Sequence, residues 1–375
     1  MKKTIYADNA ATTQLDTDAY EAMKPFMTEC YANASQPYSF SKKAKEALKD
    51  ARATIAECIN AEPDEIIFTS GGTESNNWVI KESALNDYYY RATITSTIEH
   101  HSILYSCEAI ERLKYPVAYI RPNRFGVIEP NVLNDFLSDK TRLVSLMFAN
   151  NEIGSIQPIK DLCKLAHSKG ALFHTDAVQA IGHIPIDVKK LDVDMLSASA
   201  HKFNGPKGIG FLYCKEKCLQ PFHDGGAQEF KMRAGTENVA AIVGMAVALK
   251  KNIANITTNS EKLRKISSIF INELNRHNID FIINGDPVNR LPGNINISIM
   301  GRDGESILHM LDLQGICIST GSACDSLNQQ ISHVIKSIDV PEEYAKGTIR
   351  ISFGVNNTEQ DAIDIASIID HTLNL

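Results

Sequence analysis

Short β-branched runs alternate with amphipathic stretches through the first two thirds of the chain, and this alternation constrains its fold most strongly. Between the runs, segments such as 159–169 carry apolar residues at helical spacing and end at Gly170. Parallel strands need helical crossovers, so the pattern predicts an α/β fold with a mostly parallel sheet covered by helices on both faces. The predicted strands are residues 66–69, 92–95, 143–146, 171–174 and 195–197.

A second, smaller α/β domain is predicted in the last third. A long helical stretch from about residue 239 to residue 276 leads out of the first domain, and strands are expected near 281–283, 294–298 and 349–352. The chain has 375 residues, of which 43% are apolar, so it is long enough to bury two cores. We predict a large domain over residues 15–258 and a small domain formed by residues 1–14 and 259–375.

Charge and cysteine usage exclude several classes of protein. The net charge is −7 and no basic run stands out, so direct contact with nucleic acid is not expected. The chain lacks a signal-peptide core and a membrane-length apolar run, and its eight cysteines have no framework spacing, so a cytoplasmic protein is expected. Cys214 and Cys218 have no second ligand pair nearby, which favours two half-buried thiols over zinc.

A lysine just after one predicted strand and an aspartate at the end of an earlier one indicate pyridoxal phosphate chemistry. Lys202 closes the segment Ser199-Ala200-His201-Lys202, behind the apolar run 193–198. Its amine can form a Schiff base with the cofactor aldehyde, while a carboxylate such as Asp176 keeps the pyridine nitrogen protonated. Asp176 is also suited to capping a helix, and the two roles are compatible.

The segment Gly71-Gly72-Thr73 follows the strand 66–69 and opens an expected helix, which favours phosphate binding. Glycines allow close backbone approach, and free N–H groups at a helix start attract phosphate. Ser199 and His201 add donors for the same phosphate. An ordinary tight turn is the alternative for the glycine segment.

Further strand ends offer candidate contacts with the cofactor ring. His100 follows the strand 92–95, where an imidazole can stack on the ring and move protons; a capping role is the alternative. Gln179 is a candidate donor to the ring hydroxyl. One amide of Asn150-Asn151 is a candidate for the ring oxygen, and a simple turn is the alternative.

A thiol and an arginine complete the candidate site. Cys324 lies in a polar stretch without periodicity, which predicts a loop where a nucleophilic thiolate is accessible. Cys317 is instead expected to be a small buried residue. Arg350 alternates with two isoleucines on a predicted strand and suits a bidentate clamp on a substrate carboxylate. An exposed strand arginine is the alternative.

Taken together, these segments resemble the class I cysteine desulfurases, pyridoxal phosphate enzymes that supply sulfur for iron–sulfur clusters and thio-modified tRNA. The likeness runs nearly end to end. It departs from the family pattern at Tyr38, at Ala227 and at Gln330-Ile331. The matching segments are residues 6–13, 69–75, 150–154, 174–176, 199–202, 232–238 and 321–324.

The resemblance implies the aminotransferase-like fold of type I pyridoxal phosphate enzymes, in a homodimer with its active sites at the subunit interface. It implies that Lys202 is the Schiff-base lysine and proton shuttle, and that Cys324 accepts the sulfur. It assigns the substrate carboxylate to Arg350 and gives Asn151 as a second substrate-binding residue. The implied cofactor-binding residues are Gly72, Thr73, His100, Asn151, Asp176, Gln179, Ser199, His201 and Lys202, joined by Thr236 from a second subunit.

The sequence therefore predicts a sulfurtransferase that converts L-cysteine to L-alanine and passes sulfur to Cys324 as a persulfide. The expected partners are L-cysteine and a sulfur-acceptor protein, either an iron–sulfur scaffold or a tRNA-thiolation protein, and no resident metal is expected. Two alternatives remain. One is a selenocysteine lyase, transaminase or other lyase of the same fold, because fold alone does not separate these reactions. The other is a non-catalytic scaffold.

Overall fold

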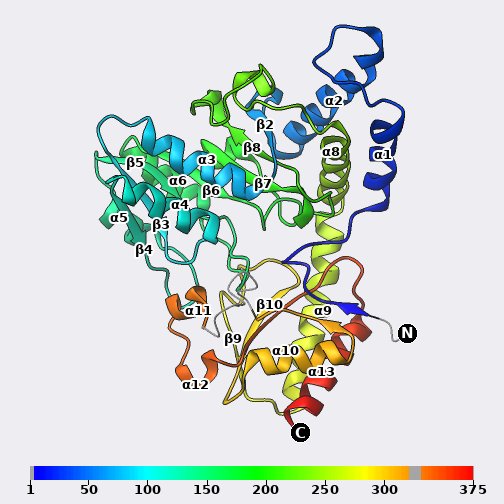
Figure 1. Cartoon of the computed structure of the whole chain (residues 1–375). Coiled ribbons are helices and arrows are strands. Elements are labelled where there is room, and N and C mark those ends of the chain that lie inside the picture. The colour runs from blue at the N-terminus through cyan, green and yellow to red at the C-terminus, as the bar shows by residue number, and fades with distance from the viewer. Residues whose placement is uncertain (1–3, 321–330, 375) are drawn as a thin grey trace.

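The computed structural model describes residues 4–320 and 331–374, and its largest layer is a seven-stranded sheet (Figure 1). The strand order is β2-β8-β7-β6-β5-β3-β4, and β8 alone runs in the opposite direction to the other six strands. The predicted α/β fold is therefore confirmed, and β4 and β8 are strands that the sequence pattern does not predict. The strands are β2 (Ile66–Thr69), β3 (Ala92–Ser96), β4 (Val117–Ile120), β5 (Thr141–Ser145), β6 (Leu172–Asp176), β7 (Met195–Ser199) and β8 (Gly210–Cys214).

Helices cover both faces of this sheet, and each face has its own apolar core. On one face, Ile55, Phe173 and Phe203 are fully buried in the larger core. On the other face, Trp78 and Ile103 are fully buried against the sheet, and the indole of Trp78 donates to the carbonyl of Gln220 at 2.9 Å. The helices that follow in chain order are α1 (Thr17–Thr28), α2 (Lys42–Ile59), α3 (Gly72–Leu85), α4 (His101–Arg112), α5 (Pro130–Phe136), α6 (Ile159–Ser168) and α7 (Val188–Leu191).

The predicted helical stretch over 239–276 is confirmed, and it consists of two helices with a bend between them. These are α8 (Val239–Ala254) and α9 (Ile256–Arg276), which meet at an angle of 71°. Asn255 lies between them with φ −110° and ψ 9°, and its side chain donates to the carbonyl of Lys251 at 2.8 Å. An asparagine amide competes with helical hydrogen bonding in this way. Within residues 4–320 and 331–374 no single helix is long and apolar enough to cross a membrane, and α8 and α9 pass that test only as this bent pair.

The C-terminal third forms a three-stranded antiparallel sheet in the order β12-β10-β9. Phe270 of α9 and Ile297 of β10 are fully buried in its core, where Ala7 joins them from the N-terminus. The domain boundaries proposed from the sequence stay a prediction. The elements are β1 (Ile5–Tyr6), β9 (Phe281–Ile283), β10 (Asn294–Ile299), α10 (Gly304–Leu313), β11 (Ile316–Cys317), α11 (His333–Ser337), α12 (Glu342–Ala345), β12 (Thr348–Ser352) and α13 (Glu359–Leu373).

The N-terminal strap, which we define as residues 8–13, connects the small sheet with the large one. At its start the backbone N–H of Asn9 donates to the carbonyl of Ser352 on β12 at 3.1 Å. At its end the backbone N–H of Thr13 donates to the carbonyl of His201, which follows β7, at 2.9 Å. The strap therefore places backbone groups between the two sheets.

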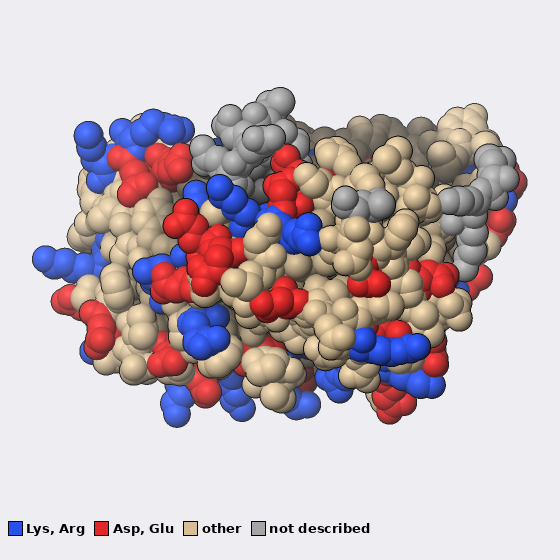
Figure 2. Space-filling model, turned by 90° about the horizontal axis from the view of Figure 1, so that it is seen from below, with Lys and Arg blue, Asp and Glu red and all other residues tan. Residues whose placement is uncertain are grey.

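Acidic and basic side chains are interspersed on the lower face of the molecule (Figure 2).

At the carboxyl end of β8, the Sγ atoms of Cys214 and Cys218 lie 3.7 Å apart, with Cys214 buried and Cys218 half-buried. This arrangement agrees with the interpretation of the pair as two thiols at the end of a strand.

Candidate active site

A cavity of about 380 Å³ lies where the parallel strands β5, β6 and β7 reach their carboxyl ends. Ligands bind at this edge in open α/β sheets. The cavity brings together ten of the twelve predicted site residues. Thr236 lies elsewhere, exposed in a separate pocket beside Ser70 and Gly208, and Cys324 lies outside the described residues. The ten are Gly72, Thr73, His100, Asn151, Asp176, Gln179, Ser199, His201, Lys202 and Arg350.

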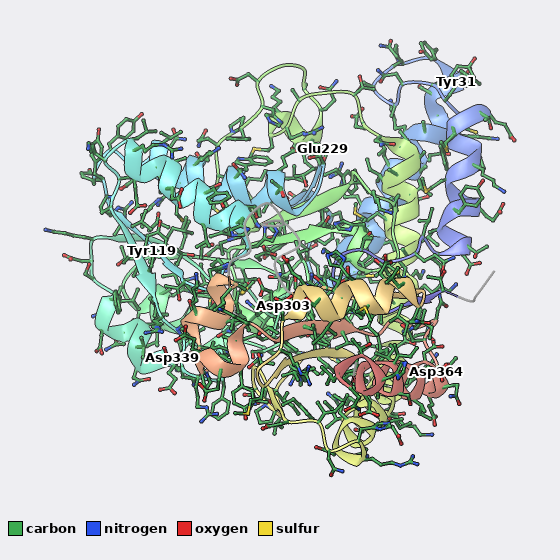
Figure 3. All side chains as sticks on the ribbon, turned by 60° about the horizontal axis from the view of Figure 1, so that its bottom comes forward. Tyr31, Tyr119, Glu229, Asp303, Asp339 and Asp364 are labelled. Carbon is green, nitrogen blue, oxygen red and sulfur yellow. The ribbon has the colours of Figure 1, made fainter. Side chains whose placement is uncertain are left out.

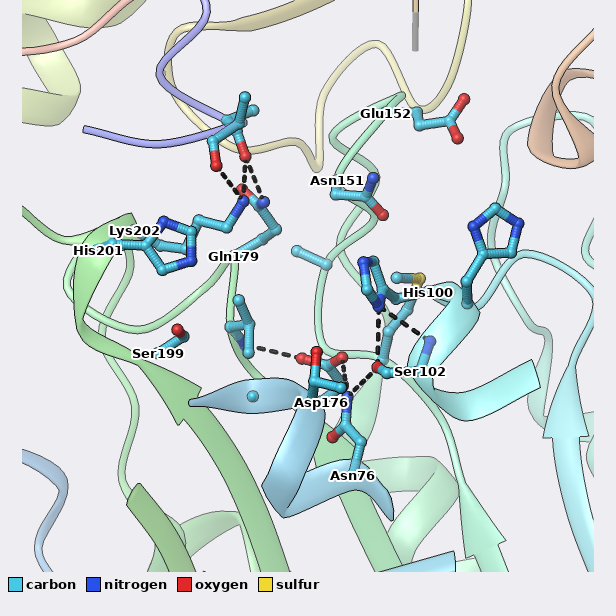
Figure 4. Close-up of a pocket in the computed structure, with 18 of the residues that line it drawn as sticks. Asn76, His100, Ser102, Asn151, Glu152, Asp176, Gln179, Ser199, His201 and Lys202 are labelled. Atoms are coloured by element: carbon cyan, nitrogen blue, oxygen red, sulfur yellow. Dashed lines mark hydrogen bonds between the residues drawn. The ribbon is translucent and has the colours of Figure 1, made fainter. Parts of the chain in front are cut away.

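Lys202 projects from the short turn η3 (Ala200–Lys202), which follows β7, and reaches the N-terminal strap (Figure 4). Its Nζ donates to the carbonyl oxygens of Ala10 at 2.5 Å and Ala11 at 2.7 Å. The Nε2 of Gln179 donates to the same Ala10 carbonyl at 2.9 Å. Because an ammonium group has three donors and no acceptor, two carbonyls form a suitable seat for it.

A chain of hydrogen bonds connects Asp176 with His100 along one wall of the cavity (Figure 4). One carboxylate oxygen of Asp176 accepts from the backbone of Val178 at 2.9 Å, and the other accepts from the Nδ2 of Asn76 at 2.7 Å. Asn76 also donates to the hydroxyl of Ser102 at 2.9 Å, and that hydroxyl lies 2.8 Å from the Nδ1 of His100. Asp176 therefore caps its own turn and also lines the cavity.

The geometry around His100 determines which ring nitrogen carries its proton. His100 is the N-cap of α4, and its Nδ1 accepts from the backbone N–H of Ser102 at 3.1 Å. The neutral ring therefore carries its proton on Nε2. Burial lowers the pKa of His100, and the positive charge of Lys202 adds to this effect while Asp176 opposes it. The capping alternative is thus correct, and it coexists with the position in the cavity.

The turn before α3 favours glycine at two positions, at Gly71 through its backbone conformation and at Gly72 through close packing. Gly71 has φ +147°, which favours glycine, and a Cβ on Gly72 would lie 2.5 Å from a methyl group of Val178. Ser199, which is buried, lies across this turn. Burial lowers the pKa of His201 to about 4, so its ring is neutral near pH 7. The region therefore combines a helix N-terminus with neutral hydrogen-bonding groups.

Arg350 lies on β12, and the alternative of an exposed strand arginine is wrong, because its side chain is only 3% exposed. Its Nη2 lies 2.7 Å from a carboxylate oxygen of Asp8, and its Nη1 donates to the backbone carbonyl of Asn151 at 3.1 Å. The amide of Asn150 forms the neighbouring turn by accepting from the backbone of Glu152 at 2.8 Å. Asn150 therefore has a structural role in the turn, and Asn151 is the residue of this pair that lines the cavity.

Several groups in this site are absent from the sequence-based prediction. Asn76 is the clearest case, since it lies four residues after Gly72 and therefore on the same helix face, which is a signal that spacing provides. Ser102 and Asp8 have no comparable signal. The carbonyls of Ala10 and Ala11 also give no signal in the sequence, because every residue has a backbone carbonyl.

Glu99 is a fully buried carboxyl group next to His100 in the chain. One of its oxygens accepts from the hydroxyl of Ser96 at 2.6 Å and from the backbone of Met147 at 3.0 Å. Its other oxygen has no hydrogen-bond partner within the described part of the chain. Burial raises the pKa of Glu99 to about 8, so the acid is protonated at neutral pH.

The raised pKa of Glu99 predicts how stability depends on pH. Below the ordinary pKa of 4.5 both folded and unfolded chains are protonated there, whereas between 4.5 and about 8 the folded protein holds the extra proton. Stability from this group is therefore present in full below pH 4.5 and is lost as pH rises through 8. Glu99→Gln resembles the protonated acid, so we expect similar unfolding free energies at pH 5 and a variant more stable by several kcal/mol at pH 9. Parallel loss of stability in both proteins, measured by urea unfolding, would contradict this.

Comparisons with known proteins agree with one another. Residues 5–364 match the model of the aminotransferase class-V family. Cysteine desulfurase IscS from Dictyoglomus turgidum is 47% identical over 96% of this chain and 92% of that protein. A solved structure of a NifS-like protein superposes with a TM-score of 0.94 at 33% identity, over 99% of this chain and 100% of that one. A structure described as SspA in complex with cysteine superposes with a TM-score of 0.82 at 33% identity, over 93% and 99% of the two chains.

Proposed function

The chain belongs to the aminotransferase class-V family and, within it, to the cysteine desulfurases, and we propose that the cavity around Lys202 takes sulfur from L-cysteine. In the proposed reaction L-cysteine becomes L-alanine and the thiol of Cys324 becomes a persulfide. The carbon–sulfur bond of L-cysteine and the S–H bond of Cys324 break, while a sulfur–sulfur bond and the new C–H bond of L-alanine form, so atoms and electrons balance without an external oxidant. The observation that carries this proposal is the convergence of Lys202, Asp176 and Arg350 on one cavity.

The residues of this cavity fit pyridoxal phosphate, the cofactor on which the family depends. When bound, this group supplies an electron-withdrawing ring that stabilises negative charge at the α-carbon of an amino acid. Lys202 would hold its aldehyde carbon, and the buried carboxylate of Asp176 would hold its ring N–H. The turn at Gly72 is closed to side chains, as a backbone site for phosphate requires. Thr73, Ser199 and His201 would bind the same phosphate, and Asn151 and Gln179 the ring oxygen.

Three side chains would move protons and bind the substrate. The Nζ of Lys202 would remove the α-proton of the substrate and pass it to the cofactor, and the carbonyls of Ala10 and Ala11 would accept hydrogen bonds from the amine when it is charged. The ring of His100 would stack on the cofactor and offer its Nε2 proton. Arg350 would bind the substrate carboxylate.

The flanks of the segment that contains Cys324 support its role as sulfur acceptor. Ser319 pairs with Arg350 through both backbone hydrogen bonds, and the hydroxyl of Ser332 donates to Glu152, which lines the cavity, at 2.6 Å. Cys324 is five residues from Ser319, and an extended chain of that length spans at most about 17 Å. A thiol at this position is therefore within reach of substrate bound at Arg350.

The wider setting of the enzyme follows from the family resemblance. We propose a homodimer in which Thr236 of each subunit completes the phosphate site of the other, and its exposure outside the cavity is compatible with that role. The proposed acceptor of the persulfide sulfur is an iron–sulfur scaffold or a tRNA-thiolation protein. The cytoplasmic location stays a prediction.

The reaction is tested by reconstituting the purified protein with pyridoxal phosphate and supplying L-cysteine with a thiol reductant. We expect equal amounts of L-alanine and sulfide, because the reductant releases the persulfide sulfur. A keto acid in place of L-alanine would favour the transaminase alternative. Turnover of L-selenocysteine without turnover of L-cysteine would favour the lyase.

A further inference from the structure

Two of the three guanidinium nitrogens of Arg350 donate hydrogen bonds to other groups of the protein, without any substrate. Asp8 accepts from Nη2 at 2.7 Å, and the backbone carbonyl of Asn151 accepts from Nη1 at 3.1 Å. The Asp8 side chain is 17% exposed and that of Arg350 is 3% exposed, so the ion pair is largely withdrawn from water. The Nε of Arg350 is buried and has no hydrogen-bond partner among residues 4–320 and 331–374.

These two contacts determine which part of the guanidinium remains for a ligand. The group is planar and has five N–H donors, of which Asp8 and Asn151 use one each. Contacts at both terminal nitrogens fix the plane of the group, which the flexible side chain alone does not. Three donors remain, one on each terminal nitrogen and one on the buried Nε, and Arg350 lines the cavity. A carboxylate in the cavity would therefore meet donors that are already oriented.

The charge of Asp8 matters as much as its hydrogen bond. A buried cation that loses its anionic partner is unstable where it is and turns toward other acceptors. With substrate present, the guanidinium would lie between two carboxylates. Because Coulomb energy falls with distance, its contact with each carboxylate outweighs the repulsion between the more distant anions. Asp8 therefore orients the cation without cancelling its attraction for substrate.

Asp8 is attached to the fold independently of its carboxylate. Its backbone carbonyl accepts from the backbone of Ala11 at 3.0 Å and from the hydroxyl of Tyr6 at 3.0 Å. The next residue, Asn9, donates from its backbone to Ser352 at 3.1 Å. An isosteric change at Asp8 is therefore expected to remove the charge while leaving the N-terminal strap in place.

We propose that Asp8 is a positioning residue for substrate binding, which fixes the Arg350 guanidinium so that its free donors meet the carboxylate of L-cysteine. This rests on the proposed role of Arg350 as carboxylate clamp. The strap on which Asp8 lies also provides the carbonyl seat of Lys202, so one short segment orients both cationic groups of the site.

The test compares Asp8→Asn with wild-type holoenzyme. We expect the KM for L-cysteine to rise roughly tenfold while kcat stays within about twofold, because a neutral amide holds the cation less firmly than a carboxylate does. Asp8→Glu, which keeps the charge, should recover part of the loss. The matched control is Asp339→Asn, which breaks the ion pair between Asp339 and Arg121, of similar length at 2.6 Å. The side chains of Arg121 and Asp339 are 57% and 75% exposed, and neither residue lines the cavity. Asp339 is labelled in Figure 3. That variant should keep the wild-type KM.

Comparing ligands with and without a carboxylate distinguishes a loss of Arg350 positioning from general damage to the binding site. Dissociation constants of L-alanine and of cysteamine are measured by titrating the cofactor absorbance of the Asp8→Asn and Asp8→Glu holoenzymes. We expect weaker binding of L-alanine and unchanged binding of cysteamine, in whichever variant folds. Equal changes for both ligands, or an unchanged or lower KM for L-cysteine in Asp8→Asn, would overturn the proposal.

A fourth variant, Arg350→Ala, distinguishes failure of the role proposed for Asp8 from failure of the proposed function. Arg350→Ala should raise the KM for L-cysteine more than Asp8→Asn does, and adding Asp8→Asn to it should cause no further rise. If Arg350→Ala raises KM and Asp8→Asn does not, the role of Asp8 is wrong and the clamp stands. If Arg350→Ala leaves KM unchanged, the clamp is wrong, and the positioning role of Asp8 is overturned with it.

Discussion

Cys324→Ala is expected to lose nearly all formation of L-alanine from L-cysteine, by about 10³-fold or more, while keeping its cofactor. The reason is that the substrate sulfur needs a nucleophile, and water or free thiol does not replace one that is held near the substrate. Bound cofactor is measured by its absorbance, and L-alanine by amino-acid analysis. Retention of the chromophore shows that the loss comes from the missing thiol and not from the fold.

A second cysteine provides the matched control. Cys317 lies seven positions earlier on β11, where it is half-buried and not buried as expected, and burial raises its pKa. Its thiol is therefore a poor nucleophile. Cys317→Ala should keep its rate within about twofold of wild type. Undiminished turnover in Cys324→Ala would reject the role of that thiol.

Lys202→Ala is expected to lose covalent attachment of the cofactor and to lower the rate by about 10⁴-fold or more, since in the proposed mechanism the same amine attaches the cofactor and moves the substrate proton. Both functions are measured on one sample, by cofactor absorbance after gel filtration and by L-alanine formation. The control is Lys207→Ala, an exposed lysine five positions later, which should behave as wild type. Near-normal turnover by Lys202→Ala would contradict the assignment.

The sequence pattern predicts the sheet well where strands and helices alternate, and less well elsewhere. The five predicted strands of the large domain are present as β2, β3, β5, β6 and β7. β8 has no crossover helix before it, because it returns antiparallel from the Lys202 turn, so the alternation does not mark it. The break at Asn255 was not predicted since asparagine occurs both inside and at the ends of helices, and the choice depends on tertiary packing.

The candidate site divides in the same way. Lys202, Asp176 and His100 are at strand ends, and the topology of a parallel sheet brings such positions to one edge. Their partners are harder to predict, because the carbonyls that receive Lys202 come from Ala10 and Ala11, more than 190 residues away in the sequence. Spacing carries no information about such contacts. The same holds for Asp8, whose ion pair joins the first strap residue to β12.

Covalent attachment of the cofactor to Lys202 is tested most directly by borohydride reduction of the reconstituted protein, followed by proteolysis and mass spectrometry. Reduction fixes the cofactor to whichever amine holds it, so the label reports the position without relying on activity. We predict one labelled lysine, at position 202. A label on another lysine, or a reconstituted protein without the yellow chromophore, would contradict the proposed site and the chemistry derived from it.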